Sequence, residues 1–459
     1  MHRYWRRSGW LILGLLCLVT WHAPPPAAQQ TGGGTTGETT APLSQAALPT
    51  TDGAIALGNL QAQIAAAERL ASDGPVTVSQ RAAMAVLLTM RGQFLGRIAD
   101  YERAELLAEQ LVHDAPTDGR AFLARAQARS TLHRFAAALA DLAEAERLGA
   151  NSDRIAAVRA TVLQARGHFD EALALRQHLT QVHPDIRSLG AEASVRADRG
   201  EIDEAARLFR KAEQQYRDVS PFPVVWLYFQ QGLMWMWEGN LMRARELFAA
   251  ACARLPGYAA AQGHLAIVEA ALARHERTTA VFYQWMQEGP LERPQQRAAA
   301  TQGEETVSGS RYERAIALLR PLANSSDDPE YASQLARVLT EVGQLDEAHH
   351  WRAVAATRYD ELMARYPEAF VDHAAAFWLA VGGDAQKGLL LAVKNLEMRQ
   401  TPRAYELALQ AAVATQQTAV LCRIAGSLPA VAQMGPRLHA LAVHTWTACS
   451  RLSRPAEGG

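Results

Sequence analysis

The chain has 459 residues, which is long enough for two or three globular domains or for one extended repeat array. Its 46 lysine and arginine residues nearly balance its 47 aspartate and glutamate residues, so no nucleic acid or other polyanionic partner is expected. Alanine is abundant, strand-forming runs are scarce, and long stretches have helical spacing. The composition therefore predicts an all-α protein.

The amino terminus has the features of an export signal. Arg3, Arg6 and Arg7 precede an apolar run over residues 10–21, which is too short for a comfortable membrane span but suits a signal-peptide core. We therefore expect residues 1–28 to be a signal peptide, with an uncleaved membrane anchor as the alternative. The predicted destination is the periplasm or cell envelope of a bacterium.

Composition divides the rest of the chain into four parts. Residues 29–50 are rich in glycine, threonine and proline and predict a flexible linker. Residues 51–79 predict an amino-terminal helix. A repeat array follows over 80–400, and residues 401–459 predict a degenerate repeat with a capping helix.

A repeated segment of about 34 residues runs through the middle of the chain. Each copy opens with a turn residue, has an apolar or aromatic residue two positions later, and has a small residue three positions beyond that. A unit of this kind holds two short helices, and the small residue lets the second helix lie close against the first. Because one unit cannot bury both of its faces, neighbouring units stack. The small residues, spaced by 33 to 39 positions, are Ala104, Ala138, Ala172, Ala205, Ala244, Ala280, Ala315 and Ala348.

These segments resemble the tetratricopeptide repeat (TPR) family, which has a small residue early in the first helix and a glycine at the turn. The resemblance implies a right-handed α-solenoid of about eight or nine stacked helical hairpins. The early small residues are Gly92, Ala126, Ala160, Ala193, Gly232 and Gly303, and the turn glycines are Gly167, Gly200, Gly239 and Gly343.

The repeat pattern weakens at three places. Arg125 and Arg129 stand where the family usually has large apolar residues. The segment 285–310 makes a poor first helix for the repeat of Ala315. Residues 357–400 carry Gly388 at the position of the small alanine.

The stretch 224–240 carries three tryptophans among other large apolar residues. With Ala244 as the small residue of the second helix, Tyr228 and Trp235 fall on the face that packs in the family. In TPR arrays the opposite face lines a concave groove, and a helix that is apolar all round is either buried or awaits a partner. The resemblance therefore implies a partner-binding groove formed by Trp226, Phe229, Leu233, Met236 and Trp237.

Small residues stand at the corresponding positions of the preceding repeat, namely Gly190, Ser194 and Ala197. Two arrangements follow from this neighbourhood. The aromatic rings either lie over the small residues and fill the solenoid, or they form a ridge beside pockets that suit an apolar peptide or helix.

The sequence contains no pattern of residues that predicts catalysis, a cofactor site or a metal site. The adjacent pair His349 and His350 points in directions about 100° apart on a helix, which does not suit a shared metal ion. Cys252, Cys422 and Cys449 are interpreted as isolated thiols in helix packing, with pairing of Cys422 and Cys449 as the alternative.

The resulting hypothesis is a non-catalytic protein–protein interaction scaffold of the cell envelope, which binds a peptide or protein in its concave groove. One alternative is a structural subunit of an envelope assembly. A second alternative is an accessory protein or enzyme of cell-wall glycan metabolism. Such an enzyme needs paired carboxylates in a cleft, and usually a separate catalytic domain, for which too little chain remains after residue 400.

Overall fold

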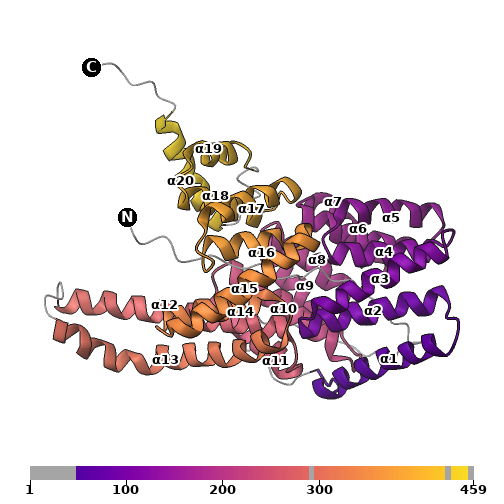
Figure 1. Cartoon of the computed structure of the whole chain (residues 1–459), viewed down its shortest axis with the longest axis horizontal. Helices are drawn as coiled ribbons and strands as arrows, with labels where there is room; N and C mark the ends of the chain where they lie inside the picture. The colour runs from indigo at the N-terminus through magenta and orange to yellow at the C-terminus, as the bar shows by residue number, and fades with distance from the viewer. Residues whose placement is uncertain (1–47, 289–293, 429–435, 453–459) are drawn as a thin grey trace, which may run out of the picture.

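The computed structural model describes residues 48–288, 294–428 and 436–452, and in these residues every regular element is a helix. The expected signal peptide and nearly all of the expected linker lie outside them. The all-α prediction is confirmed (Figure 1). The helices are α1 (Gly53–Asp73), α2 (Val78–Leu95), α3 (Ile98–Asp114), α4 (Gly119–Thr131), α5 (Phe135–Arg147), α6 (Ser152–Arg166), α7 (Phe169–Val182), α8 (Ile186–Asp198), α9 (Ile202–Gln215), α10 (Pro221–Trp237), α11 (Leu241–Arg254), α12 (Ala259–Glu288), α13 (Pro294–Ser325), α14 (Pro329–Glu341), α15 (Leu345–Arg365), α16 (Pro367–Leu379), α17 (Ala385–Met398), α18 (Pro402–Ala414), α19 (Thr418–Gly426) and α20 (Pro436–Leu452).

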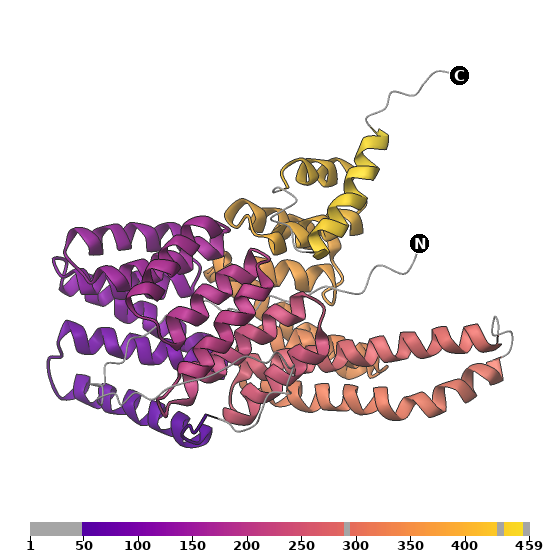
Figure 2. The same cartoon turned by 180° about the vertical axis from the view of Figure 1, so that it is seen from behind.

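From α2 onward, consecutive helices pair into antiparallel hairpins that stack into a solenoid (Figures 1 and 2). The small residue of each second helix lies in the hairpin contact, and Ala138, Ala172 and Ala205 are fully buried there. The turn glycines adopt the left-handed backbone conformation that ends the first helix, with φ of 90° at Gly167 and 80° at Gly239. The repeat spacing therefore correctly predicts the TPR-like hairpins.

The prediction that Ala280 is the small residue in the second helix of a separate repeat is wrong. Helix α12 runs unbroken past Ala280 because no glycine or proline interrupts the chain between Gly263 and Gly289. Gly303, expected early in a first helix, lies inside α13, which is a second helix. One long hairpin therefore occupies the chain length of two repeats, and it projects from the body in both ribbon views (Figures 1 and 2).

Two arginines occupy positions that are usually apolar in the TPR family, and buried ion pairs explain them. Arg125 and Arg129 lie on α4, between Glu109 of α3 and Asp141 of α5. Each guanidinium group contacts both carboxylates at 2.7 to 2.9 Å. Asp141 is only 4% exposed, so the four charges replace apolar contacts between these helices with paired ones.

The solenoid closes on itself, because turns of the early hairpins contact loops of the late ones. Asp327, between α13 and α14, accepts hydrogen bonds from the backbone N–H of Ile98 at 2.7 Å and of Ala99 at 2.9 Å. Arg399, at the end of α17, lies 2.7 Å from Nδ1 of His133 in the α4–α5 turn. We call this contact the seam. It joins Gly96, Ile98, Ala99, Glu102, His133, Arg166 and Asp198 to Ser326, Asp327, Arg365, Arg399, Gln400 and Arg403.

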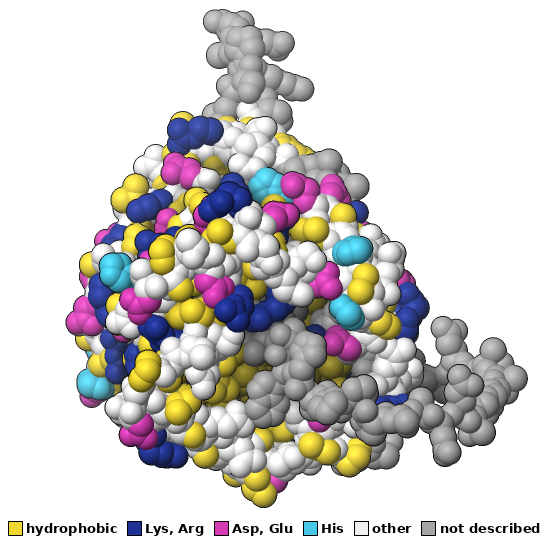
Figure 3. All heavy atoms as spheres, turned by 90° about the vertical axis from the view of Figure 1, so that its right-hand side faces the viewer, with side chains coloured by type: hydrophobic (Ala, Val, Ile, Leu, Met, Phe, Trp, Pro, Cys, Tyr) yellow, Lys and Arg dark blue, Asp and Glu magenta, His cyan; other side chains and the backbone are white. Residues whose placement is uncertain are grey.

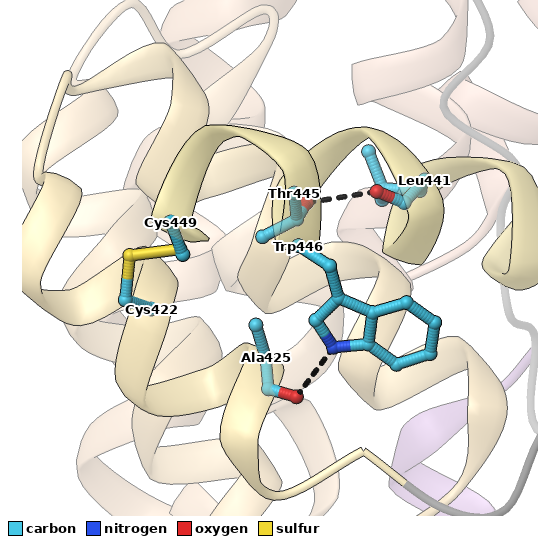
Figure 4. The surroundings of a disulfide bond; sticks show 6 residues. All are labelled: Cys422, Ala425, Leu441, Thr445, Trp446 and Cys449. Atoms are coloured by element: carbon cyan, nitrogen blue, oxygen red, sulfur yellow. Dashed lines mark hydrogen bonds between the residues drawn. A yellow bond between two sulfur atoms is a disulfide. The ribbon is translucent and has the colours of Figure 1, made fainter. Parts of the chain in front are cut away.

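A disulfide bond fastens the last two helices. Cys422 of α19 is bonded to Cys449 of α20, and Nε1 of Trp446 donates a hydrogen bond to the carbonyl oxygen of Ala425 at 3.1 Å (Figure 4). The interpretation of these two cysteines as isolated thiols is therefore wrong. The structure has the alternative, in which Cys422 and Cys449 are paired. Cys252 is a free thiol.

Candidate partner-binding surface

The five residues expected to line an open groove lie on α10, and four of them are buried. Trp226 is 4% exposed, Phe229 1%, Leu233 8% and Met236 8%, whereas Trp237 is half-buried. An exposed ridge, one of the two arrangements considered from the sequence, is therefore not what the structure has for these four residues.

Phe229 is buried because it packs against the second helix of its own hairpin and against the next hairpin, rather than lining a groove. Its ring centroid lies 5.7 Å from that of Phe248 on α11, 5.3 Å from that of Tyr258 and 5.0 Å from that of His264 on α12. These distances are typical of packed aromatic pairs. Phe229 is therefore part of the core between hairpins.

Trp226 lies over the small residues of the preceding hairpin. A methyl group added to Gly190 of α8 would lie 2.8 Å from an atom of the Trp226 ring. Of the two arrangements considered from the sequence, the structure therefore has the one in which the rings fill the solenoid. The indole Nε1 of Trp226 is buried without a hydrogen-bond partner.

The half-buried ring of Trp237 faces α18, a helix that lies far along the chain and comes close to α10 because the solenoid closes. The guanidinium carbon of Arg403 on α18 lies 4.5 Å from the ring centroid, within the range of a cation–π contact. Arg403 also contacts Asp198 of α8 at 3.2 Å. Trp237 thus lies next to the seam, where α8, α10 and α18 meet.

Polar side chains join three first helices on the same side of the solenoid. Gln164 of α6 donates hydrogen bonds from Nε2 to Ser194 Oγ at 3.1 Å and to Asp198 at 2.8 Å. Ser194 donates to Gln230 of α10 at 3.4 Å. First helices of stacked hairpins line the concave side of such arrays. We call the side of α6, α8 and α10 that carries Arg154, Ala157, Thr161, Gln164, Ser194, Gln230 and Trp237 the inner face.

The inner face has an excess of hydrogen-bond donors. The buried atoms Nε of Arg154, Nε1 of Trp226 and Nε2 of Gln230 have no partner within the described chain. Nε of Arg176, whose guanidinium group reaches Thr161 of α6, has none either. A buried donor without an acceptor destabilises a fold by about 1–3 kcal/mol, so a ligand rich in acceptors would gain by binding here.

Sequence reasoning missed most of the inner face. Gln164, Ser194 and Gln230 are ordinary polar residues in helices, and their alignment depends on how the hairpins stack. Arg403 comes from a helix far along the chain and reaches the inner face only because the solenoid closes. Arg176 did carry a signal, because it stands four residues after the small Ala172, within the hairpin contact.

The described residues contain no cluster of histidine, cysteine, aspartate or glutamate that could hold a metal ion, and His349 and His350 are exposed. None of the described helices is long and apolar enough to cross a membrane. On the end of the molecule that lies to the right in Figure 1, cationic and anionic side chains are intermixed rather than gathered by sign (Figure 3).

No protein-family model and no curated protein matches the chain. Among solved structures, a human IFIT1 dimer with m7Gppp-AAAA has a TM-score of 0.40 and 13% identity over 88% of this chain and 78% of that one. Yeast Tom70 has a TM-score of 0.34 and 12% identity over 87% of this chain and 98% of that one. Both are TPR-containing helical proteins. At identities this low, the similarity concerns at most the fold. It says nothing about what this chain binds.

Proposed function

We propose that the protein is a non-catalytic interaction scaffold that binds a peptide or protein partner along the inner face. The observation that carries this proposal is the set of buried donors on α6, α7 and α10 without acceptors. An extended peptide presents a row of backbone carbonyl oxygens, which are acceptors at regular spacing. The half-buried Trp237 provides an apolar contact at one end of the same face.

A matched pair of substitutions tests this location. Ala157 lies on α6 between Arg154 and Thr161 and is half-buried, whereas Ala174 on α7 is exposed. Ala157→Tyr places a bulky side chain on the inner face, and Ala174→Tyr places the same side chain on the outer surface. We expect a partner crosslinked to the wild-type protein in an extract to be lost with Ala157→Tyr and retained with Ala174→Tyr.

Circular dichroism and thermal unfolding of both variants verify that the solenoid is intact. If folded Ala157→Tyr protein retains every partner of the wild type, the inner face is not the binding surface and the proposal fails.

We further propose that the protein acts outside the cytoplasm, in the cell envelope. The Cys422–Cys449 disulfide supports this location, because disulfide bonds persist mainly in oxidising compartments. Alkylation of free thiols in intact cells, followed by mass spectrometry, should find Cys422 and Cys449 protected and Cys252 free after unfolding. A protein found reduced at both positions, or recovered in the cytoplasmic fraction, would contradict this location.

A further inference from the structure

Arg176 occupies a core position of the solenoid. It lies four residues after Ala172, the small residue of its hairpin, and its side chain is 4% exposed. The equivalent residue in four other hairpins is apolar and fully buried. These residues are Leu142, Phe209, Phe248 and Leu319. Core packing at this position therefore does not require a guanidinium group.

The described chain provides no counter-charge for Arg176. Its Nη2 donates one hydrogen bond, to Oγ1 of Thr161 at 2.6 Å, and its Nε has no partner. Burial lowers the pKa of Arg176 to about 10, and no carboxylate raises it again. The group therefore remains protonated at neutral pH, as a buried cation without an anion.

Two other arginines of this solenoid show how such a charge can be balanced. Arg125 on α4 lies between two carboxylates, and Arg399 at the seam contacts Asp372 at 2.5 Å. A buried cation that lacks such a partner destabilises the folded chain. Arg176 therefore occupies a position at which the fold alone would favour leucine or phenylalanine.

A second arginine extends the same region. Arg154 lies two helical turns before Thr161 on α6, and hence on the same side of that helix. Burial lowers its pKa as well, no carboxylate opposes that shift, and its Nε has no partner. The hydroxyl of Thr161 donates to the carbonyl oxygen of Ala157 and accepts from Arg176, so the helix backbone holds it in place.

We propose that Arg176, positioned by Thr161 and assisted by Arg154, binds an oxyanion carried by the partner peptide. The proposal rests on the proposed function and specifies the chemistry of its ligand. A guanidinium group pairs with carboxylate and phosphate oxygens alike, so the oxyanion is either an aspartate or glutamate side chain or a phosphoryl group. The ligand would provide the negative charge that the solenoid lacks at this point.

The test compares three labelled hexapeptides by fluorescence anisotropy with the full chain, namely hexaglutamate, a hexaserine with two phosphoserines, and neutral hexaglutamine. We expect an anionic peptide to bind at least tenfold more tightly than hexaglutamine, with affinity that falls as salt is added. Tighter binding of hexaglutamate would identify the carboxylate as the oxyanion, and tighter binding of the phosphopeptide would identify the phosphoryl group.

The decisive variant is Arg176→Leu, which restores the residue type of the equivalent position in α5. We expect its affinity for the anionic peptide to fall at least tenfold, while its thermal midpoint stays equal to that of the wild type or rises. Thr161→Val removes the hydroxyl and is expected to weaken binding several-fold. Arg125→Leu is the control, because it removes an arginine that is already paired within the fold, and should leave binding unchanged.

Unchanged peptide affinity in Arg176→Leu would overturn the proposal, and so would a lower thermal midpoint, because the arginine would then serve the fold. If neither anionic peptide binds while Ala157→Tyr still loses its crosslinked partner, the oxyanion inference fails and the proposed scaffold function stands. If Ala157→Tyr keeps that partner, the proposed function fails as well.

Discussion

Around α10, rings packed between neighbouring hairpins hold the solenoid together, whereas at the seam charged and polar groups join hairpins that are far apart in the chain. Phe229 of α10 and His264 of α12 belong to adjacent hairpins, and their rings lie in one aromatic cluster with Phe248 of α11. His133 and Arg399 are 266 residues apart and meet through a hydrogen bond. Contacts of the first kind follow from the repeat pattern, whereas contacts of the second kind depend on how far the whole solenoid curves.

The largest expected effect is at the aromatic core. Phe248 is fully buried, and its ring lies against Gly232 of α10. We expect Phe248→Ala to lower the free energy of unfolding by about 4 kcal/mol, because it removes a buried ring and leaves a cavity. Chemical denaturation monitored by circular dichroism measures the change. A loss below about 1 kcal/mol would show that the neighbouring hairpins collapse into the space and that the core is less specific than its packing indicates.

A somewhat smaller effect is expected for the buried charge at the seam. Burial alone would raise the pKa of Asp372, but the adjacent Arg399 lowers it. Arg399→Ala removes the ion-pair partner at 2.5 Å from the buried Asp372 carboxylate, which then keeps only its contacts with His373. We expect it to lower the free energy of unfolding by about 3 kcal/mol. The double variant Arg399→Met with Asp372→Leu removes both charges and should recover most of that loss. If the double variant is no more stable than Arg399→Ala, the unpaired charge of Asp372 is not the cause of the stability that Arg399→Ala loses.

A pH experiment compares a histidine of the core with one of the seam. His264 is fully buried, and burial lowers its pKa to about 4. Burial and the neighbouring Arg399 also lower the pKa of His133. Between pH 6.5 and about 4 the unfolded chain binds a proton at His264 that the folded chain does not bind. Stability is therefore fully present above pH 6.5 and is lost as the pH falls.

For His264 this loss amounts to about 2–3 kcal/mol at pH 4. Unfolding curves of the wild type and of His264→Asn, recorded from pH 7 to pH 4, measure it as the difference between their pH slopes. Parallel slopes would show that His264 is not the group that titrates. A matching series with His133→Asn measures the contribution of the seam.

The smallest expected effect concerns a helix cap contributed across the seam. Arg97, the N-cap residue of α3, makes no capping hydrogen bond with its own side chain. Instead, the two carboxylate oxygens of Asp327 accept hydrogen bonds from the backbone N–H groups of Ile98 and Ala99 in the first turn of α3. Asp327→Ala should destabilise the protein by about 1–2 kcal/mol, and Asp327→Asn, which keeps one acceptor, by less. Hydrogen exchange of the Ile98 and Ala99 amides reports the cap directly, and unchanged exchange in Asp327→Ala would contradict this role.

The parts of the fold that could be predicted are those encoded by residues close together in sequence. The spacing of the small alanines and the turn glycines predicts the hairpins, because the close approach and the turn that these residues allow lie within one unit. The length of α12 was missed because Ala280 fits the repeat spacing inside an uninterrupted helix. The direction of Phe229 was missed because family positions place it in the groove, whereas Tyr258 and His264 offer it an aromatic pocket.

The candidate site could be located only in part. The sequence directed attention to α10, and Trp237 does lie on the inner face, but most of the residues that define this face come from α6 and α8. Arg176 stands out only when each hairpin is compared with its neighbours at one equivalent position. A partner-binding role for the residues of α10 stays a prediction.

The seam also has a consequence for the order in which the protein is made. At roughly 5–20 residues per second, the ribosome needs on the order of 10–50 seconds after synthesising His133 to synthesise Arg399. During that interval the early hairpins can stack, because their contacts are local, but the polar groups at their turns remain in water. Bringing together residues so far apart in the chain costs more loop-closure entropy than forming local contacts. We therefore expect the seam to form last, after the carboxy-terminal hairpins are complete.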